Sequence, residues 1–394
     1  MEKVRYGIIG LGNQGSYYTG LFVEGQIKDA EISAVCDIND AKIEKLKEKL
    51  EKLPNMPKIY KDYKEMVKSG LCDVILVETP HYFHPEMVEF CLQNGVSVIC
   101  DKPAGVYTKQ VREMNEVAKK SKATFGMMFN QRTNCTFRKM REIIASGGIG
   151  ELQRVTWKIT DWYRTQSYYD SGSWRATWKG EGGGVLINQC PHQLDLIQWV
   201  VGEMPVSVNA FCKYGRWHNI EVEDEVTAYL EYKNGATGVF ITTTGETPGS
   251  NVFEVSGSLG KLVCEDTSKL TWYKNKEDAF VHSRTSESGF LRPEYDIINV
   301  ETDGKNEQHV GILNNFTQSM LGREKLFVSG EEGINGVELM NAMELSGWNG
   351  GEKICIPVDE DRYLKELDEK RAVSVYKDVN DDKVADTNNT FGTK

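Results

Sequence analysis

The chain of 394 residues is longer than one hydrophobic core usually supports, so its length predicts two domains. Hydrophobic residues make up 40% and charged residues 27%, as in soluble globular proteins, and no apolar run approaches the roughly 18 residues needed to cross a bilayer. The formal net charge of −11, without a dense cluster of lysine and arginine, argues against nucleic acid as a partner.

The nine cysteines are scattered along the chain, without a C-x-x-C pair or a close group with histidine. This distribution predicts neither a metal site nor a disulfide framework. His81 and His84 lie three residues apart, but no third ligand is close in the sequence. The first twelve residues are too short and too broken by glycine for a secretory signal. We therefore expect a cytoplasmic protein with reduced thiols, no metal and no membrane segment.

A strand is predicted over Val4–Ile9, and it leads into a turn from Gly10 to Gly15 that reads G-L-G-N-Q-G. A helix is predicted to follow over Ser16–Val23. The pattern G-x-G-x-x-G between strand and helix is typical of a dinucleotide-binding turn. Its first glycine permits the tight turn, its second lets the backbone approach a pyrophosphate, and its third lets the helix pack on the strand.

The second predicted strand, Glu31–Cys36, ends at Asp37. An acidic residue at about this distance after the glycine turn binds the hydroxyls of the adenosine ribose in dinucleotide-binding domains. No arginine follows that could receive a 2′-phosphate, so the sequence favours NAD over NADP. The alternative is that Asp37 only caps a turn.

Strands and helices continue to alternate up to Phe129, which predicts parallel crossover units and a doubly wound α/β sheet for residues 1–129. The expected segments are Lys58–Tyr60, Asp62–Lys68, Asp73–Glu78, Pro85–Asn94, Val96–Cys100, Thr108–Lys119 and Thr124–Phe129. Residues at the carboxyl ends of such strands gather around a bound ligand. In this chain they are Gly10, Asp37, Thr79, Pro80, Asp101 and Lys102.

Lys102 follows an apolar strand and precedes Pro103, which restricts the lysine backbone to extended geometry and so fixes the direction of its side chain. A lysine in this place is poorly positioned to serve solubility alone. The alternative is an ordinary surface lysine at a turn.

Beyond Asn130 alternating apolar segments follow one another with few helices between them, which predicts an α+β domain with a mostly antiparallel sheet over residues 130–372. The expected strands are Leu152–Thr160, Ser207–Lys213, Val226–Tyr232, Thr237–Thr243, Asn251–Ser256 and Lys261–Glu265. Helices are expected over Phe137–Ser146, His309–Leu321 and Gly333–Trp348. The polar residues 373–394 are expected to form a mobile tail or an arm over a neighbouring subunit.

A long loop over Asp161–Glu181 is rich in tryptophan, tyrosine, arginine and glycine, and such loops line sites more often than cores. Five of its side chains are suited to stack on sugar faces or to hydrogen-bond hydroxyls: Trp162, Tyr163, Trp174, Arg175 and Trp178. The alternative is that they pack an oligomer contact.

The stretch Gly182–Gly202 opens with three glycines and continues as a helix with apolar residues at spacings of three and four. We expect this helix to be anchored in a core and to present Asn188, Gln189 and His192 at its polar first turn. A titratable imidazole in that place is a candidate general base. The alternative is a capped helix with a satisfied histidine.

Four motifs occur in order along the chain: the glycine turn, Thr79-Pro80-x-x-x-His84, Asp101-Lys102-Pro103, and the glycines 182–184 followed by His192-x-x-Asp195. In this ordered set the chain resembles the Gfo/Idh/MocA oxidoreductase family, named for glucose-fructose oxidoreductase and inositol dehydrogenase. The resemblance covers nearly the whole chain and weakens after about Leu364. It implies a Rossmann domain followed by a domain whose open, mostly antiparallel sheet carries the substrate site and the oligomer interface.

The resemblance assigns the catalytic lysine to Lys102 and the catalytic histidine to His192. His192 would then accept the proton of a substrate hydroxyl, and Lys102 would stabilise the developing alkoxide. Trp174 and Arg175 match a Trp-Arg pair that is common in the family and is expected near nicotinamide and substrate. Asp195 lies one turn further into the helix, where a structural role is expected.

Two positions depart from the family pattern. Asp101 stands in place of a glutamate and keeps its charge on a shorter side chain. Asn188 stands where inositol-dehydrogenase-like members have an aspartate four residues before the histidine, so His192 is expected to be a weaker base than in those members. Proline is tolerated in the first turn of a helix, so a helix that starts near Pro191 would leave Asn188 in the preceding loop.

Together these observations predict an NAD-dependent oxidoreductase that oxidises a secondary hydroxyl of a pyranose sugar or glycoside, with C3 of a glucoside as the expected position. The alternatives are a cyclitol dehydrogenase, an NAD-dependent glycosidase acting through transient oxidation and elimination, and a non-catalytic regulator. A homodimer, tetramer or hexamer is expected. The expected cofactor contacts are Gly10, Leu11, Gly12, Asn13, Gln14, Gly15, Asp37, Thr79, Pro80, His84, Asp101, Lys102, Gln131, Trp174 and Arg175. The expected substrate contacts are Asn188, Gln189, Trp162, Tyr163, Trp174 and Arg175.

Overall fold

The computed structural model describes residues 3–379, which form two compact units. The first unit comprises residues 3–133 and Asn306–Val337, and the second comprises Asn134–Lys305 and residues 338–379. Among the described residues, no helix is both long enough and apolar enough to span a membrane.

The first unit is built on a six-stranded sheet in the order β3-β2-β1-β4-β5-β6, in which every neighbouring pair is parallel. Its elements up to residue 127 are β1 Val4–Ile9, α1 Asn13–Val23, β2 Ala30–Cys36, α2 Asp40–Leu50, β3 Lys58–Tyr60, α3 Tyr63–Lys68, β4 Val74–Val77, α4 His84–Gln93, β5 Ser97–Cys100, α5 Thr108–Lys120 and β6 Phe125–Met127. The doubly wound parallel sheet is therefore confirmed.

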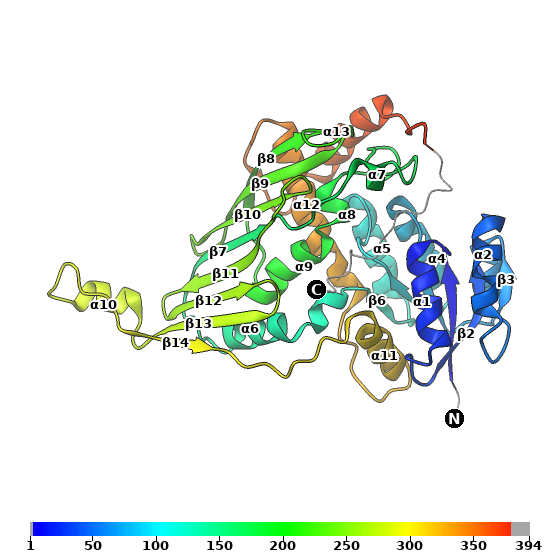
Figure 1. The fold of residues 1–394 in the computed structure, drawn as a ribbon, viewed down its shortest axis with the longest axis horizontal. Coiled ribbons are helices and arrows are strands. Elements are labelled where there is room, and N and C mark those ends of the chain that lie inside the picture. The colour runs from blue at the N-terminus through cyan, green and yellow to red at the C-terminus, as the bar shows by residue number, and fades with distance from the viewer. Residues whose placement is uncertain (1–2, 380–394) are drawn as a thin grey trace. The chain divides into compact units, whose positions relative to one another are not determined.

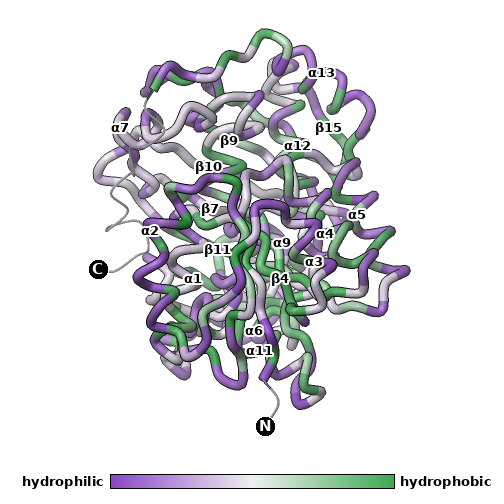
Figure 2. The backbone as a smooth tube through the Cα atoms, turned by 90° about the vertical axis from the view of Figure 1, so that its right-hand side faces the viewer, coloured by the Kyte–Doolittle hydropathy of each residue, from purple (hydrophilic) through white to green (hydrophobic). Residues whose placement is uncertain are grey.

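Burial explains why β4 is apolar throughout and why β5 is apolar after Ser97. All four residues of each strand are buried, as expected for strands covered on both faces by crossover helices. Figure 2 shows the contrast between the hydrophobic strand β4 and the hydrophilic helix α2, which has only three buried residues. A later helix, α11 Gln308–Met320, completes this unit, and Thr317 from it hydrogen-bonds the buried Tyr6 hydroxyl at 2.8 Å.

The second unit contains a nine-stranded sheet in the order β14-β13-β12-β11-β7-β10-β9-β8-β15. Figure 1 shows the strands from β14 to β8 side by side. Only the pair β7 and β10 is parallel within it, so the mostly antiparallel sheet is confirmed. The elements of this unit, including one helix that begins in the first unit, are α6 Cys135–Ala145, β7 Leu152–Ile159, α7 Gln166–Tyr169, α8 Val185–Asn188, α9 Pro191–Val201, β8 Ser207–Tyr214, β9 Glu223–Glu231, β10 Thr237–Thr243, β11 Asn251–Gly257, β12 Gly260–Glu265, β13 Lys269–Asn275, α10 Ala279–Thr285, β14 Tyr295–Asn299, α12 Gly333–Trp348, β15 Ile354–Cys355 and α13 Glu360–Val373.

The core of the second unit lies between one face of this sheet and helices α6, α9 and α12. Trp157 of β7 stacks on Phe253 of β11 with ring centroids 4.3 Å apart, and Phe137 of α6 lies 5.8 Å from Trp157. Side chains alternate between buried and partly exposed along β9, β10 and β11. This alternation is the pattern of an antiparallel sheet that is covered on one face.

Strands β13, β14 and β15 and helices α10 and α13 were not predicted from the sequence. All five residues of β14 are exposed and β15 has only two residues, so neither carries a clear burial period. Helix α10 lies on an arm that extends beyond the edge of the sheet (Figure 1).

The predicted tail, residues 373–394, is described only as far as residue 379. Ser374 is buried directly after α13, and Lys377 N donates to Ser173 O at 3.0 Å. This part of the tail therefore contacts the aromatic loop of its own chain. Residues 380–394 lie outside the described residues.

Candidate active site

The three glycines of the turn after β1 differ in the space around them: two are packed closely against backbone, and one faces open space. A Cβ on Gly10 would lie 2.3 Å from the Glu78 carbonyl oxygen, and one on Gly15 would lie 2.0 Å from the Gly10 carbonyl oxygen. Gly10 also has a φ of 92°, which other residues rarely adopt. A Cβ on Gly12 would meet no heavy atom within 4 Å. The fold itself requires Gly10 and Gly15, whereas Gly12 leaves space at the N-terminus of α1, where a phosphate is favoured.

Asp37 is tied to this turn by its carboxylate. Oδ2 accepts a hydrogen bond from Leu11 N at 2.8 Å, and Oδ1 accepts one from Asn39 N at 2.8 Å. The turn-capping alternative is thus part of its role. An ionised carboxylate has about four acceptor positions, so these two bonds leave capacity for the ribose hydroxyls.

His84 connects the two segments that leave β4 and β5. Its Nδ1 lies 2.8 Å from Pro103 O and its Nε2 lies 2.6 Å from Thr79 O, and the side chain is buried. Burial lowers the pKa of His84, although both carbonyl oxygens and the charge of Asp101 oppose this effect. With both ring nitrogens facing carbonyl oxygens, His84 positions the turn after Lys102 and offers no nitrogen to a cofactor.

Two residues of α11 join this edge of the first unit, and neither was singled out from the sequence. His309 lies against Tyr17 and Tyr18, and its Nε2 is 3.4 Å from Gln14 Nε2. Burial lowers the pKa of His309 to about 4, with the charge of Lys102 as the second cause. Gln308, at a φ of 52°, accepts a hydrogen bond from Gln131 Nε2 at 3.2 Å.

In the second unit, His192 occupies the first turn of α9. Pro191 is the first residue of this helix and Cys190 precedes it, as the tolerance of proline in a first turn predicts. Asn188 ends the separate one-turn helix α8, so the two residues are not successive turns of one helix. Asp195 is buried deeper in α9, where Gln198 Nε2 donates to its Oδ1 at 3.3 Å.

Asn188 is held by a buried glutamate. Its Nδ2 donates to Glu181 Oε1, and Tyr168 OH donates to its Oδ1 at 3.3 Å. Glu181 is buried and also accepts a hydrogen bond from Ala176 N at 2.6 Å. Burial raises the pKa of Glu181, while Arg175, with a nitrogen 4.0 Å away, lowers it. The carboxyl missing at position 188 is therefore replaced by the Glu181 carboxyl, which is hydrogen-bonded to Asn188.

Tyr168 brings together several predicted substrate residues. The Arg175 guanidinium lies 4.9 Å from the Tyr168 ring and 4.6 Å from the Trp174 ring, and it donates to Tyr168 OH at 3.2 Å. Gln189 Nε2 donates to the same hydroxyl at 3.4 Å. Gln189 is buried, and its Oε1 receives no hydrogen bond from any described residue. We call Tyr168, Trp174, Arg175, Asn188 and Gln189 the polar cluster.

The other aromatic residues of the loop lie differently. Arg164 stacks over Trp162 at 5.5 Å and over Tyr168 at 5.2 Å, which links Trp162 to the polar cluster. Tyr163 is 48% exposed, and no contact places it in the cluster. Trp178 is buried against Trp348, with ring centroids 5.5 Å apart, so it is a core residue.

Two further carboxyls are buried beneath the glycines that precede α8. A Cβ on Gly184 would lie 2.0 Å from Glu223 O, and one on Gly183 would lie 2.6 Å from Glu344 Oε1. Glu223 Oε1 accepts hydrogen bonds from Gly184 N at 2.8 Å and Leu186 N at 3.1 Å. Burial raises the pKa of Glu223 to about 7 and that of Glu344 well above its usual range.

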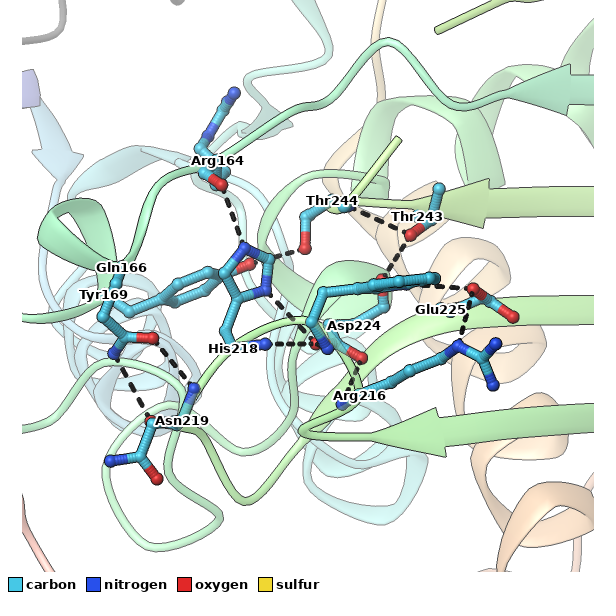
Figure 3. A network of polar contacts seen from close by, with 12 residues as sticks. Arg164, Gln166, Tyr169, Arg216, His218, Asn219, Asp224, Glu225, Thr243 and Thr244 are labelled. Carbon is cyan, nitrogen blue, oxygen red and sulfur yellow. Dashed lines mark hydrogen bonds and ion pairs between the residues drawn. The ribbon is translucent and has the colours of Figure 1, made fainter. Parts of the chain in front are cut away.

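The aromatic loop is anchored by the network shown in Figure 3. His218 Nε2 donates to Arg164 O at 2.9 Å, and its Nδ1 lies 3.2 Å from Asp224 Oδ2. Tyr169 packs on the His218 ring at 4.8 Å and donates to Thr244 Oγ1 at 2.8 Å. Because these nitrogens face the chain itself, His218 fastens the loop to the start of β9 and is not free to act as a base.

Sequence reasoning missed Tyr168, Glu181, Glu223 and the pair His218 and Asp224. One signal was available: Glu221, Glu223 and Asp224 are acidic residues at the start of a strand. Acidic residues are depleted in strands unless they have partners there. Glu181 lies directly before three glycines, which permit another side chain to come close. The sequence does not indicate which side chain does so.

Comparison with known proteins agrees with this geometry. Residues 4–129 match the model described as the oxidoreductase family with an NAD-binding Rossmann fold, and residues 137–263 match the Gfo/Idh/MocA C-terminal domain. The two together cover more than half of the 394 residues. The chain belongs to the Gfo/Idh/MocA oxidoreductase family. Its first unit is accordingly the NAD-binding domain of that family.

Among the relatives of this family member, inositol 2-dehydrogenase of Rhizobium meliloti is 25% identical over 267 residues, 67% of this chain and 76% of that protein. The rhizopine catabolism protein MocA of Rhizobium meliloti is 27% identical over 207 residues. That match spans 52% of this chain and only 60% of MocA.

Solved structures share the fold over nearly the whole chain. The WlbA dehydrogenase of Chromobacterium violaceum, solved with NADH and UDP-GlcNAcA, has a TM-score of 0.76 and 25% identity and covers 91% of this chain and 97% of its own. Levoglucosan dehydrogenase, solved with NADH and levoglucosan, has a TM-score of 0.73 at 18% identity and covers 90% of this chain and 100% of its own.

Proposed function

We propose that this protein oxidises a secondary hydroxyl of a pyranose sugar or glycoside with NAD. The observation that carries the proposal is the polar cluster at α8, which places amide, guanidinium and phenol groups around a short helix. This helix ends at Asn188, three residues before Pro191, and His192 follows directly. Such a set binds several hydroxyls at once, with an imidazole next in the chain as the base.

The first unit fits NAD by its own contacts. The open side of Gly12 at the N-terminus of α1 leaves room for a pyrophosphate, and the Asp37 carboxylate is fastened at the same turn for the ribose hydroxyls. NAD, when bound, supplies the hydride acceptor at C4 of its nicotinamide. We assign the remaining contacts to Lys102, Gln131 and the segment that His84 holds in place.

His192 takes the hydroxyl proton in this proposal, and Lys102 stabilises the oxygen as negative charge develops on it. Asn188 binds a neighbouring hydroxyl and is kept in one orientation by Glu181 and Tyr168. The buried Gln189 Oε1, which receives no hydrogen bond from the described residues, accepts another. The resemblance of Asp101-Lys102-Pro103 and His192 to the catalytic motifs of the family supports the roles of Lys102 and His192.

Aromatic residues favour a pyranose ring. The Arg175 guanidinium lies over the rings of both Trp174 and Tyr168, and the buried Nε1 of Trp162 has no acceptor among the described residues. A flat aromatic side chain with a free N–H suits one face of a sugar and one of its hydroxyls. We place the oxidised carbon at C3 of a glucoside, which gives a 3-oxo sugar.

A panel experiment tests this proposal. Purified protein is incubated with NAD and with glucosides, free hexoses or inositols, NADH is followed by absorbance, and products are identified by mass spectrometry. NADH and an oxidised glycoside support the proposal, whereas turnover of inositols alone contradicts the substrate class. Aglycone release without net NADH would indicate a glycosidase, and no turnover at all would reject the enzyme.

We further propose a homo-oligomer formed through the exposed side of the nine-stranded sheet. Phe211, Tyr229, Tyr295 and Ile297 on this sheet are 41% to 63% exposed, and Phe290 on the arm is 97% exposed. Phe211 and Tyr229 lie on the neighbouring strands β8 and β9, and Tyr295 and Ile297 lie on β14 at the other end of the sheet. Apolar side chains are thus exposed at both ends of the sheet, as on an interaction surface. Light scattering of the wild type and of Ile297→Asp tests it, since the variant should shift toward a smaller species.

A further inference from the structure

Two carboxyl groups, Glu78 and Asp101, follow the ends of neighbouring strands in the first unit. Val77 and Cys100 are register partners on β4 and β5, and Asp101 N donates to Val77 O at 3.1 Å. Glu78 N donates to Ile9 O at 2.8 Å, which fixes its backbone beside β1 as well. Glu78 and Asp101 are therefore matched positions on one face of the sheet.

The Glu78 carboxyl is buried among acceptors. Neither Oε1 nor Oε2 reaches solvent, and neither receives a hydrogen bond from a donor within residues 3–379. A buried carboxylate without a donor is costly, whereas a carboxylic acid can donate its own proton. Asp101 lies at the matched position after the neighbouring strand, and its charge is the second cause, after burial, that raises the pKa of Glu78. One proton on Glu78 therefore satisfies both groups.

Charges around the pair decide which carboxyl keeps the proton. Burial and the Asp101 charge raise the pKa of Glu78 well above its usual range. Burial also raises the pKa of Asp101, but the charges of Lys102 and His84 oppose that rise. These charges favour the state of the pair in which Glu78 keeps the proton and Asp101 is ionised.

Other titratable groups face the pair from three elements. Burial raises the pKa values of Tyr18 on α1 and Cys100 on β5 well above their usual ranges, so both stay neutral. Burial lowers the pKa of His84 on α4, while its contacts with Pro103 O and Thr79 O and the charge of Asp101 oppose this effect. Lys102 supplies a positive charge that acts on both carboxyls.

We propose that Glu78 is a positioning residue: it donates a hydrogen bond to ionised Asp101 and so keeps a single negative charge beside Lys102. The inference rests on the proposed function only in taking Lys102 as the catalytic lysine. Without this donor, the ionised form of Asp101 would be less stable, its pKa would rise further, and less negative charge would remain beside Lys102. The pair also accounts for an aspartate at 101 where the resembled family has a glutamate, because Glu78 adds a second carboxyl behind the shorter side chain.

Two variants with side chains of similar size distinguish the effect of the hydrogen-bond donor at Glu78 from the effect of the volume of its side chain. Glu78→Gln keeps an N–H that can donate to Asp101, and Glu78→Leu removes it. The charge of Lys102 is measured without turnover, by acetylating the protein across a pH series and quantifying the modified Lys102 peptide by mass spectrometry. Glu113→Gln, an exposed position on α5, is the control.

We expect Glu78→Leu to lower the midpoint of Lys102 acetylation by about one pH unit, because Lys102 loses an opposite charge. Glu78→Gln should keep the wild-type midpoint. Asp101→Asn removes the same charge by another route and should reproduce the fall, which keeps the test decisive if Glu78→Leu does not fold. An unchanged midpoint in both Glu78→Leu and Asp101→Asn, or a fall in Glu78→Gln equal to that in Glu78→Leu, would overturn the proposal.

Measuring activity distinguishes a failure of this inference from a failure of the proposed function. With a substrate found in the panel experiment, the pH profile of kcat for Glu78→Leu should shift in step with the acetylation midpoint, while KM for NAD stays unchanged. If the midpoint moves and kcat does not, Glu78 positions Asp101 as proposed, and the catalytic role of Lys102 is what fails.

Discussion

The chain contains two glycine-rich turns that open helices, and the close approach they permit is used in opposite ways. At the turn after β1, a Cβ on Gly12 would meet nothing within 4 Å, so one side of the turn is left open for a ligand. Before α8, a Cβ on Gly183 or Gly184 would collide with Glu344 or Glu223. The second turn is thus filled by buried carboxyls of the protein itself.

A run of glycines therefore indicates that another group comes close to the backbone, but it does not indicate whether that group is a ligand or part of the protein. The first turn is expected to govern cofactor affinity with little effect on folding. The second is expected to govern the stability of the segment that carries His192, and through it the chemistry. Four experiments test whether the two turns have these separate roles.

The largest effect is expected from His192→Ala. Loss of a general base typically lowers kcat by about 10²- to 10⁴-fold, while NAD affinity should stay close to that of the wild type. Steady-state kinetics with the substrate found in the panel gives kcat, and quenching of protein fluorescence gives the NAD affinity. A loss of NAD affinity as large as the loss of kcat would mean that the segment carrying His192 also governs cofactor binding, against the roles given to the two turns.

Next in size is the pH dependence that Glu223 imposes on stability. Burial raises the pKa of Glu223 from 4.5 to about 7, so the folded protein binds more protons than the unfolded chain between these values. Stability is therefore lost as pH rises through this window, by ~3 kcal/mol in total. Glu223→Gln can still accept from Gly184 N and Leu186 N but cannot ionise, so its unfolding free energy should not fall.

Urea denaturation at intervals from pH 4.5 to 8 checks this prediction, because the difference between Glu223→Gln and the wild type should grow with pH. Glu287→Gln, an exposed position on the arm, serves as the control. Parallel curves for Glu223→Gln and the wild type would contradict a buried, protonated Glu223.

Alanine at one glycine of each turn gives a direct contrast. Gly184→Ala forces a Cβ against Glu223 O, and such overpacking costs about 1–3 kcal/mol of unfolding free energy. Gly12→Ala should leave the unfolding free energy unchanged and weaken NAD binding, because its Cβ fills the open side. Urea denaturation and NAD titration of both variants measure the two effects. A stability loss in Gly12→Ala would show that this side of the turn is not open.

The smallest effect is expected where Asn188 meets Glu181. Asn188→Asp brings a second carboxyl against a buried one, which should cost ~1 kcal/mol of stability at neutral pH and less at low pH, where one of them is protonated. The double variant Asn188→Asp with Glu181→Gln exchanges acid and amide and should recover the loss. A double-mutant cycle from urea denaturation checks this coupling, and additive effects would contradict it.

Much of the fold could be predicted because strand burial leaves a strong pattern. The strand β4 is apolar at every position and β5 at every position except Ser97, and the glycine turn connects a strand to a helix as expected, although the helix already begins at Asn13. The strand β14 could not be predicted in the same way, since all its residues are exposed and it is defined only by pairing with β13.

The candidate site was predictable only where its residues share a motif. Lys102 and His192 lie in motifs that the sequence displays, and their catalytic roles remain predictions. Tyr168 acts on Asn188 from the one-turn helix α7 and Glu181 acts on it from the loop that follows, and no spacing rule indicates such contacts. Glu344 reaches the second turn from a helix more than 150 residues away in the chain, a distance that local patterns do not span.

The segment after α13 has a consequence for protein engineering. Lys377 N donates to Ser173 O at 3.0 Å, its ammonium contacts Tyr169 O, and Ser374 Oγ accepts from Lys179 N at 3.0 Å. The aromatic loop is thus clamped by residues about two hundred positions later in the chain. A chimera that imports a loop over 161–181 from another enzyme would transfer its side chains without their clamp. Redesign of selectivity should therefore exchange the loop and residues 374–377 together, as one cassette.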